Sequence, residues 1–341
     1  MSTLTEIAAV FLKLGSIAVG GPAVHVAMMR RELVVTRQWL DDKAFLDGFA
    51  ACQLIPGPSS TELAIMLGFR RGGLAGLLVA GSCFILPALL LMLLLACLYQ
   101  HLSSSQLFGH ALQGVRPVVV GIIAWAIVDL GRRMLKRPLD AVVALLVLAA
   151  GLAGINPIVL LMAAGVASIL RHLRRQGVAS FLPVVVSSSI VAGSLLATIF
   201  LTFLKYGAVS FGSGYVLFAF LQGDVVRGFH WLTTPQLVDA IAISQATPGP
   251  VFTVATFIGY LVAGVPGALL ATLGIFLPGF LLVPFLDRLM RFVSTRQSVR
   301  DFLDGVNLGA LGLIAAVTVV LGRASIMDLA SAAVALAAFL V

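Results

Sequence analysis

Long uncharged apolar runs are the feature that most restricts the fold of this chain. They cover residues 74–99, 139–170 and 182–204, and Asp140 is the one charged residue in them. A helix of about 20 such residues crosses the hydrocarbon of a bilayer. In lipid every backbone N–H and C=O must be paired within the structure, which leaves helices and closed barrels. The runs are continuous and rich in Leu and Ala, so they predict an all-α, polytopic membrane protein.

Composition and charge support this class. Of the 341 residues, 60% are hydrophobic and 11% charged, whereas a soluble domain is about half apolar and a quarter charged. The net charge of +8 would suggest nucleic acid in a soluble protein. Here the basic residues fall in short gaps between apolar runs, as in cytoplasmic loops, so we expect a multi-pass protein of the cell inner membrane and no nucleic-acid partner. At about 20 residues per span, roughly ten to thirteen membrane segments are predicted.

The chain repeats itself. The segment FLKLGSIAVGG that begins at Phe11 matches FLKYGAVSFGS from Phe203. The match continues without a gap from there to PGP at 56–58 and PGP at 248–250, and after a one-residue slip it extends to the GR pairs at 131 and 322. Shared apolar composition does not align such residues at one offset. We therefore predict two related halves, residues 1–151 and 196–341, joined by residues 152–195.

Charge placement predicts that the halves are inverted. Arg70 and Arg71 precede the helix expected at 74–99, and the loop after it has no Lys or Arg. In the second half the turn at 261–266 is uncharged, and the basic residues follow the helix, at Arg288, Arg291, Arg296 and Arg300. If basic loops are cytoplasmic, equivalent helices run in opposite directions. Inverted-topology repeats are a transporter architecture; a parallel repeat with scattered charges is the alternative.

Each half has two predicted helix breaks. One is GGP at 20–22, which pairs with GSG at 212–214, and the other is the PGP turn. Proline removes an N–H donor and clashes with the preceding turn, so both breaks predict broken or re-entrant helices. The half-helices that follow PGP would present the free N–H groups of their first residues, through Thr61 and Thr253, to a cavity. Helix N-termini attract anions, so we predict an oxyanion site here; a kink that only aids packing is the alternative.

Polar side chains beside the breaks are the candidate anion ligands. Lys13 and Lys205 stand in apolar segments, where a charge is costly, and His25 and the glutamines before each PGP can donate hydrogen bonds. The alternatives are snorkelling lysines, a buried histidine that is merely hydrogen-bonded, and glutamines that join helices. The predicted substrate-binding residues are Lys13, Gly20, Gly21, His25, Gln53, Pro56, Gly57, Pro58, Ser59, Ser60, Lys205, Gly212, Gln245, Pro248, Gly249 and Pro250.

Acidic residues near the PGP turns are candidates for coupling to a proton. Asp47 and Asp239 lie two helical turns ahead of them, and Glu62 follows the first turn. An acid in an apolar segment is a functional candidate, although Glu62 also suits a helix N-terminus as a favourable charge. Arg31 and Glu32 could gate the pathway or be solvated. Arg116 corresponds to Asn307 in the repeat, so any role of this arginine is specific to one half.

These motifs, in this order and spacing, resemble the chromate ion transporter family. The matching stretches are LGSIAVGGPAVHVAMMRREL, RQWLDDKAF and ACQLIPGPSSTELAIMLGF, then FLKYGAVSFGSGYVLFAFLQGDVV and ISQATPGPVFTVATFIGY. The resemblance covers almost the whole chain and implies the form with two fused domains, a membrane protein that exports chromate and confers resistance. The first half departs from the pattern where AVGGP lacks the usual Phe, and where Glu62 follows PGP.

The leading hypothesis is therefore a secondary transporter that exports chromate by alternating access. Sulfate, with the same charge and shape, is the alternative cargo, and an anion channel is the alternative from another class. No catalytic triad, metal cluster or nucleotide-binding loop stands out in the sequence, so we expect no enzyme activity and no cofactor. The lipid bilayer is the other expected partner; a monomer would suffice, and a homodimer is possible.

Overall fold

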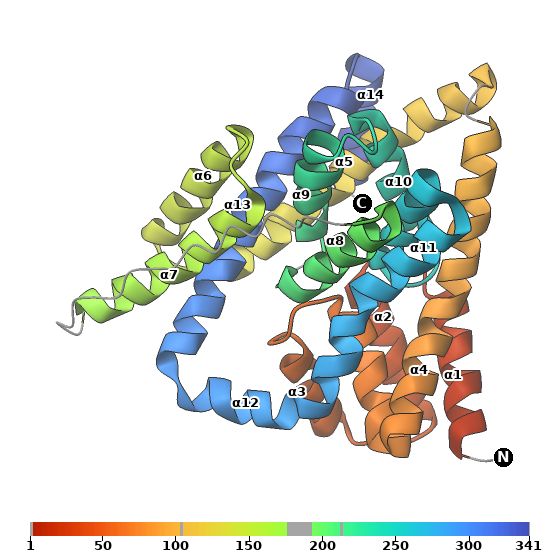
Figure 1. Ribbon diagram of the computed structural model, residues 1–341. Helices are drawn as coiled ribbons and strands as arrows, with labels where there is room; N and C mark the ends of the chain where they lie inside the picture. Colours follow the sequence, from red (N-terminus) through yellow and green to blue (C-terminus); the bar gives the residue numbers. More distant parts are fainter. Residues whose placement is uncertain (1–2, 103–104, 176–192, 212–213, 341) are drawn as a thin grey trace. The chain divides into compact units, whose positions relative to one another are not determined.

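The computed structural model describes residues 3–102, 105–175, 193–211 and 214–340, and every regular element in them is helical (Figure 1). The prediction of an all-α chain is confirmed. The residues group into two compact units. The first unit comprises residues 1–102, 190–210 and 243–290, and the second unit comprises residues 103–189, 211–242 and 291–341.

The first unit draws its helices from both ends of the chain. They are α1 (Thr3–Ile17), α2 (Pro22–Arg30), η1 (Arg31–Thr36), α3 (Asp42–Cys52), α4 (Ser59–Leu102), α8 (Leu195–Val209), η3 (Val251–Thr253), α11 (Val254–Leu282) and η4 (Val283–Phe285).

The second unit contains α5 (Gln106–Met134), α6 (Pro138–Leu152), α7 (Pro157–Arg175), α9 (Val216–Phe220), η2 (Leu221–Gly228), α13 (Gln297–Ser325) and α14 (Leu329–Leu340). Two helices are divided between the units: α10 (Thr234–Ala246) and α12 (Leu286–Thr295).

Four stretches are long and apolar enough to cross a membrane: Ser59–Leu102, Gly109–Met134, Val251–Val293 and Gln297–Ser325. Shorter apolar helices lie at Pro138–Leu152, Pro157–Arg171, Leu195–Val209 and Leu329–Leu340. Several other apolar segments form helices of 15 residues or fewer, such as α1, α8 and α14, so the count of ten to thirteen membrane segments stays a prediction.

The helices α4 and α11 are each a hairpin with a sharp bend. In α4 the bend is at Gly73, with φ 60° and ψ −149°, and in α11 it is at the equivalent Gly264, with φ 62° and ψ −152°. The two arms pack closely against each other: a Cβ on Gly68 would collide with the carbonyl of Gly76. A positive φ of this kind favours glycine. A short helical arm after PGP, as predicted, is therefore present in both halves, and it ends at a glycine bend.

Within the first unit, each half packs its first helix on its own hairpin. Gly15 of α1 lies against the backbone of Phe84, and Gly207 of α8 lies against the backbone of Ile275. These are equivalent positions of the repeat, and glycine at each one lets the two backbones approach closely. Figure 1 shows α1 beside α4 along its length.

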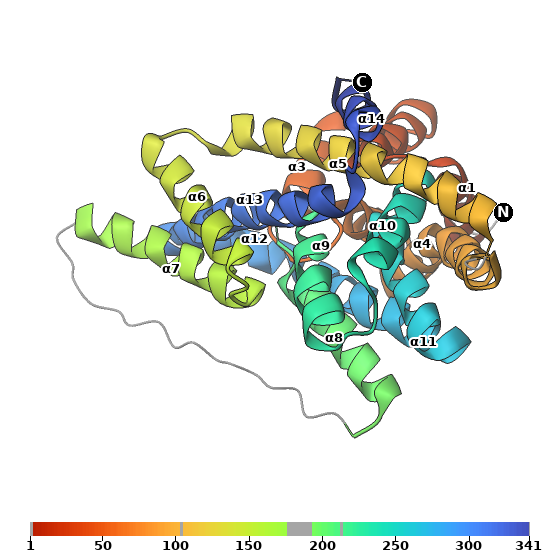
Figure 2. The ribbon, with the colours of Figure 1, turned by 90° about the horizontal axis from the view of Figure 1, so that it is seen from above.

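Within the second unit, the halves exchange their last helices. Gly121 of α5 packs on the carbonyl of Ala335 in α14, and the equivalent Gly312 of α13 packs on the carbonyl of Ala144 in α6. The long helices α5 and α13 are equivalent in the repeat and run in opposite directions (Figures 1 and 2). This is the relation expected of inverted halves; the orientation of each helix in a bilayer stays a prediction.

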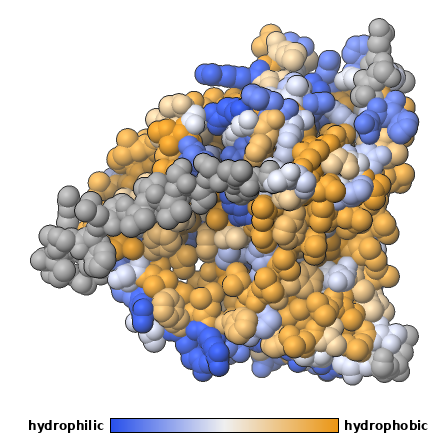
Figure 3. All heavy atoms as spheres, viewed as in Figure 1, coloured by the Kyte–Doolittle hydropathy of each residue, from blue (hydrophilic) through white to orange (hydrophobic). Residues whose placement is uncertain are grey.

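The outer side of α4 is apolar. Figure 3 shows that hydrophobic atoms dominate the face over α4 and α11, whereas hydrophilic atoms gather near α12. On α4 the exposed residues recur about every four positions: Leu74, Leu78, Leu86, Leu90, Leu94 and Leu98. Most turns of this helix thus present a leucine outward, with Ser82 between Leu78 and Leu86, which suits contact with lipid hydrocarbon.

Candidate functional site

The two PGP turns hydrogen-bond to the first helix break of the opposite half. The N–H of Gly57 donates to the carbonyl of Ser210 at 2.8 Å, and the N–H of Gly249 donates to the carbonyl of Ala18 at 2.9 Å. In the repeat Gly57 matches Gly249 and Ala18 matches Ser210, so the two bonds are equivalent. We call these four residues the crossing. Both glycines adopt a positive φ, 130° and 99°, which explains why glycine stands between the prolines.

His25 is buried beside the crossing. Its Nε2 lies 3.2 Å from the carbonyl of Ala18, and its Nδ1 lies 3.2 Å from Oγ of Ser60. A carbonyl can only accept, so Nε2 carries the hydrogen of this bond. The ring also packs edge-on against Phe84, and the side chain is 1% exposed. His25 therefore ties the first break of its half to the first turn of α4.

Glu62 is buried in the first turn of α4. It is 1% exposed, and neither carboxylate oxygen has a hydrogen-bond partner among the described residues. The side chain is placed against the backbone of Gly57 and within reach of Gly279, because a Cβ on either glycine would meet it. The hydroxyl of Thr61 is also buried, and the described part of the chain offers it no hydrogen-bond partner. Buried polar groups are normally hydrogen-bonded, so this polar group at the crossing calls for an explanation.

The first turns after PGP are tighter than predicted. The N–H of Thr61 donates to the carbonyl of Pro58 at 2.7 Å, and that of Thr253 donates to Pro250 at 3.0 Å. Short bonds of this type satisfy donors that an open α-helical turn would leave free. The expectation that the N–H groups of Thr61 and Thr253 are free is therefore wrong.

The predicted lysines lie in different surroundings. Lys13 is 55% exposed, and its Nζ lies 3.0 Å from Oε2 of Glu32. Glu32 also accepts from Nε of Arg37 at 2.8 Å, and these hydrogen bonds, first from Arg37 and then from Lys13, lower the pKa of the Glu32 carboxyl. Lys205 places its ammonium 5.3 Å from the ring centroid of Tyr206, a cation–π contact.

The remaining predicted residues differ in exposure. Gln53 caps α3 and is exposed, as are Asp47 and Arg31. Gln245 is partly buried, and its amide nitrogen has no partner among the described residues. Gly212 lies outside the described residues.

Asp239 belongs to the second unit, where it meets a residue that the sequence did not pair with it. It is 1% exposed, and its two oxygens accept from Nε and Nη2 of Arg116, at 2.7 and 2.9 Å. The two residues are 123 positions apart in the chain. The repeat marked Arg116 as different from Asn307, and no signal in one sequence joins it to Asp239.

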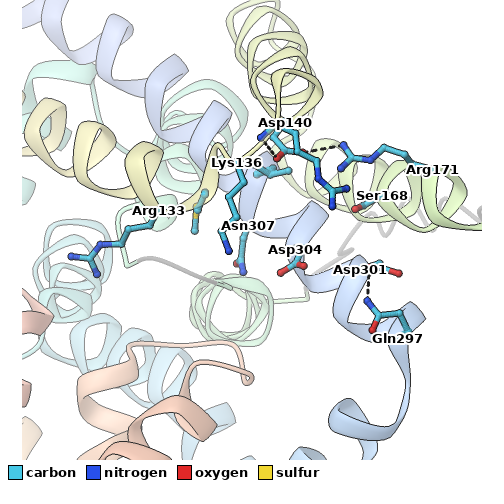
Figure 4. A pocket seen from close by; sticks show the side chains of 12 residues that line it. Arg133, Lys136, Asp140, Ser168, Arg171, Gln297, Asp301, Asp304 and Asn307 are labelled. Atoms are coloured by element: carbon cyan, nitrogen blue, oxygen red, sulfur yellow. Dashed lines mark hydrogen bonds and ion pairs between the residues drawn. The ribbon is translucent and has the colours of Figure 1, made fainter. Parts of the chain in front are cut away.

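The second unit also encloses a polar cavity of about 390 Å³ (Figure 4). It is lined by Arg133, Met134, Lys136, Arg137, Asp140, Ser168, Arg171, Gln297, Asp301, Asp304, Asn307 and Leu308. These residues come from the last turn of α5, the start of α6, the end of α7 and the first turns of α13. Asp140 is held there by Nη1 of Arg171 at 2.9 Å.

Known proteins place the chain in a family. A family model described as "Chromate transporter" matches residues 5–169 and 197–341. A chromate transport protein of Cupriavidus metallidurans is 34% identical, over 98% of this chain and 86% of the relative. One of Pseudomonas aeruginosa is 33% identical, over 96% and 83%. An uncharacterized transporter of Methanocaldococcus jannaschii is 27% identical, over 91% and 82%. No solved structure matches.

The resemblance drawn from the GGP and PGP motifs is thus confirmed over nearly the whole sequence. The match falls into two regions, and the structure is helical with apolar stretches long enough to span a membrane. The chain is a multi-pass membrane protein of the chromate transporter family.

Proposed function

We propose that this protein is a secondary transporter that exports chromate across the cell inner membrane by alternating access and so confers chromate resistance. The cargo class comes from the family and from the printed names of the relatives. The direction and the mechanism are our inference. Paired inverted halves give a carrier two related conformations, one open to each side.

The crossing is the observation that carries the proposal. Each PGP turn is bonded to the opposite half, Gly57 to Ser210 and Gly249 to Ala18. The two breaks are therefore joined directly by hydrogen bonds, so a shift at one break would act on the other. The helical segments that follow the PGP turns begin at Ser59 and Val251. Their positive N-terminal ends therefore lie beside the crossing, which favours an anion there.

We assign the anion site to the crossing and its neighbours. Pro56, Gly57, Pro58, Ser59 and Ser60 form the first side, with Gly20, Gly21 and His25 on the adjoining break. Pro248, Gly249, Pro250 and Gln245 form the equivalent side. Neutral polar groups at this site can hold a dianion and still let it leave again.

Glu62 is our candidate for coupling transport to a proton. An ionised carboxylate without partners would repel a dianion bound nearby, whereas a protonated one would not. Uptake of one proton by Glu62 would thus favour binding of the anion, and its release would favour departure. The buried, unpartnered carboxyl against Gly57 supports this role.

The decisive experiment is flux of labelled chromate into liposomes that contain the purified protein, with excess sulfate as competitor. We expect saturable chromate flux that shows counterflow and is weakly inhibited by sulfate. Stronger flux of sulfate would make the protein a general oxyanion carrier. Flux that does not saturate or show counterflow would indicate an anion channel, and no flux from folded protein would contradict the proposal.

A further inference from the structure

The second unit holds a buried ion pair between the two halves of the repeat. Arg116 lies on α5, inside the stretch Gly109–Met134 that can cross a membrane, and Asp239 lies on α10. The guanidinium contacts the carboxylate at two points, at 2.7 and 2.9 Å, and the side chains are 15% and 1% exposed. A charged residue inside a stretch that can cross a membrane is a candidate for an ion pathway, and a buried ion pair is weak evidence for stability.

We propose that Arg116 forms a second binding site for the transported oxyanion, in addition to the one assigned to the crossing, and that Asp239 is the resident anion that the cargo displaces there. This inference rests on the proposed transport of chromate. A guanidinium presents parallel N–H donors that fit two oxygens of a carboxylate and of a tetrahedral oxyanion alike. The carboxylate of Asp239 therefore takes the place of two oxygens of the cargo and carries a negative charge as they do.

The other half supports exchange at this position. Asn307 of α13 is the repeat equivalent of Arg116, and it lines the polar cavity beside Lys136 and Asp304 (Figure 4). Asp47 is the equivalent of Asp239, but Asn307 is uncharged, so an equivalent ion pair cannot form. The same helix position is thus open to a polar space in one half and covered by Asp239 in the other. In a carrier with inverted halves the two environments are expected to alternate, which uncovers Arg116.

The test compares Asp239→Asn, Arg116→Gln and the double variant R116Q/D239N in liposome flux, with the KM for chromate as the readout. Asp239→Asn removes the competing anion, so this variant should bind chromate more tightly and its KM should fall about tenfold. Arg116→Gln removes the ligand of the cargo, so its KM should rise at least about tenfold. If the ion pair had only a structural role, removal of both charges would return the KM to the wild-type value. If Arg116 binds cargo, R116Q/D239N stays folded but keeps the raised KM.

Binding is checked separately by the chromate-induced rise in unfolding temperature, expected in the wild type and absent in R116Q/D239N. The matched control is R30Q/D42N, which removes an exposed ion pair, 49% and 48% exposed, and should leave KM unchanged. A wild-type KM in R116Q/D239N, or an unchanged KM in D239N, would overturn this inference. Either result would leave the proposed transport of chromate unaffected. Absence of chromate flux and binding in the wild type would instead remove the proposed function on which it rests.

Discussion

The N–H of Gly57 donates a hydrogen bond to the carbonyl of Ser210, 2.8 Å away, and so joins the PGP turn of one half to the helix break of the other. Gly249 and Ala18 repeat this bond with the halves exchanged. Such reciprocity is consistent with the predicted two-fold relation of the two halves. It also means that the crossing is one structure, to which each half contributes a donor and an acceptor.

Substitution of either crossing glycine should stop transport. In Gly57→Ala and Gly249→Ala the new Cβ meets Glu62 and Ala88, and the positive φ adds strain of about 1–3 kcal/mol. We expect chromate flux to fall at least about tenfold with normal membrane insertion, as a factor of ten corresponds to about 1.4 kcal/mol. Gly109→Ala, a helical position with open space around it, is the control and should keep full flux. Normal flux in both crossing variants would show that the crossing is only a packing feature.

The variant Glu62→Gln should uncouple transport from the proton. The amide has the size of the carboxyl but cannot exchange a proton, so flux should become independent of an imposed pH gradient. Chromate uptake into liposomes with and without such a gradient measures this. Glu6→Gln, which changes an acid in an exposed ion-pair cluster, should keep the dependence. If the effect of the pH gradient persists in Glu62→Gln, Glu62 is not the coupling residue and another group takes up the proton.

The contact of His25 with Ser60 should be measurable as an energetic coupling. In a double-mutant cycle, His25→Ala and Ser60→Ala should be less than additive by about 1 kcal/mol, because either one alone removes the same hydrogen bond. Thermal unfolding in detergent gives the values. His25→Ala combined with Ser16→Ala should be additive, since the Ser16 hydroxyl bonds to Leu12 instead. Additivity in both cycles would mean that His25 does not hold the first turn of α4.

Lys13 is expected to have little influence on the anion. It is more than half exposed and paired with Glu32, and exposed ion pairs contribute about 0–1 kcal/mol. The KM for chromate in Lys13→Gln should therefore stay within about twofold of the wild type. A rise of tenfold would return Lys13 to the anion site that the sequence predicted for it.

The cluster around Glu32 should make stability depend on acid pH. Arg37 and Lys13 lower the pKa of Glu32 in the folded protein, so its contribution is present above the unfolded pKa of about 4.3 and is lost as pH falls through the lower folded value. The unfolding temperature in detergent should accordingly drop below about pH 4. Glu32→Gln should weaken this drop, and an identical pH profile in that variant would contradict the pairing.

Much of the candidate site could be located from the sequence because proline and glycine act locally. A PGP turn forces a break wherever it stands, and its recurrence at one repeat offset places two such breaks in the fold. The bend at Gly264 falls within the turn expected at 261–266, and the bend at Gly73 lies just before the helix expected at 74–99. That one glycine with a positive φ makes each bend is seen only in the structure. The tight first turns at Thr61 and Thr253 were also missed, because a choice between two hydrogen-bond patterns of one turn is decided by its packing.

The sequence by itself determined the membrane class, the helical fold, the duplication and the family, because these follow from apolar run length and from motifs at fixed spacing. Which residues meet across the chain was decided by the tertiary structure. Gly57 meets Ser210, and Arg116 meets Asp239, through packing between helices that are more than a hundred positions apart. Such pairings depend on how helix faces fit together, and a single sequence carries no local signal for that.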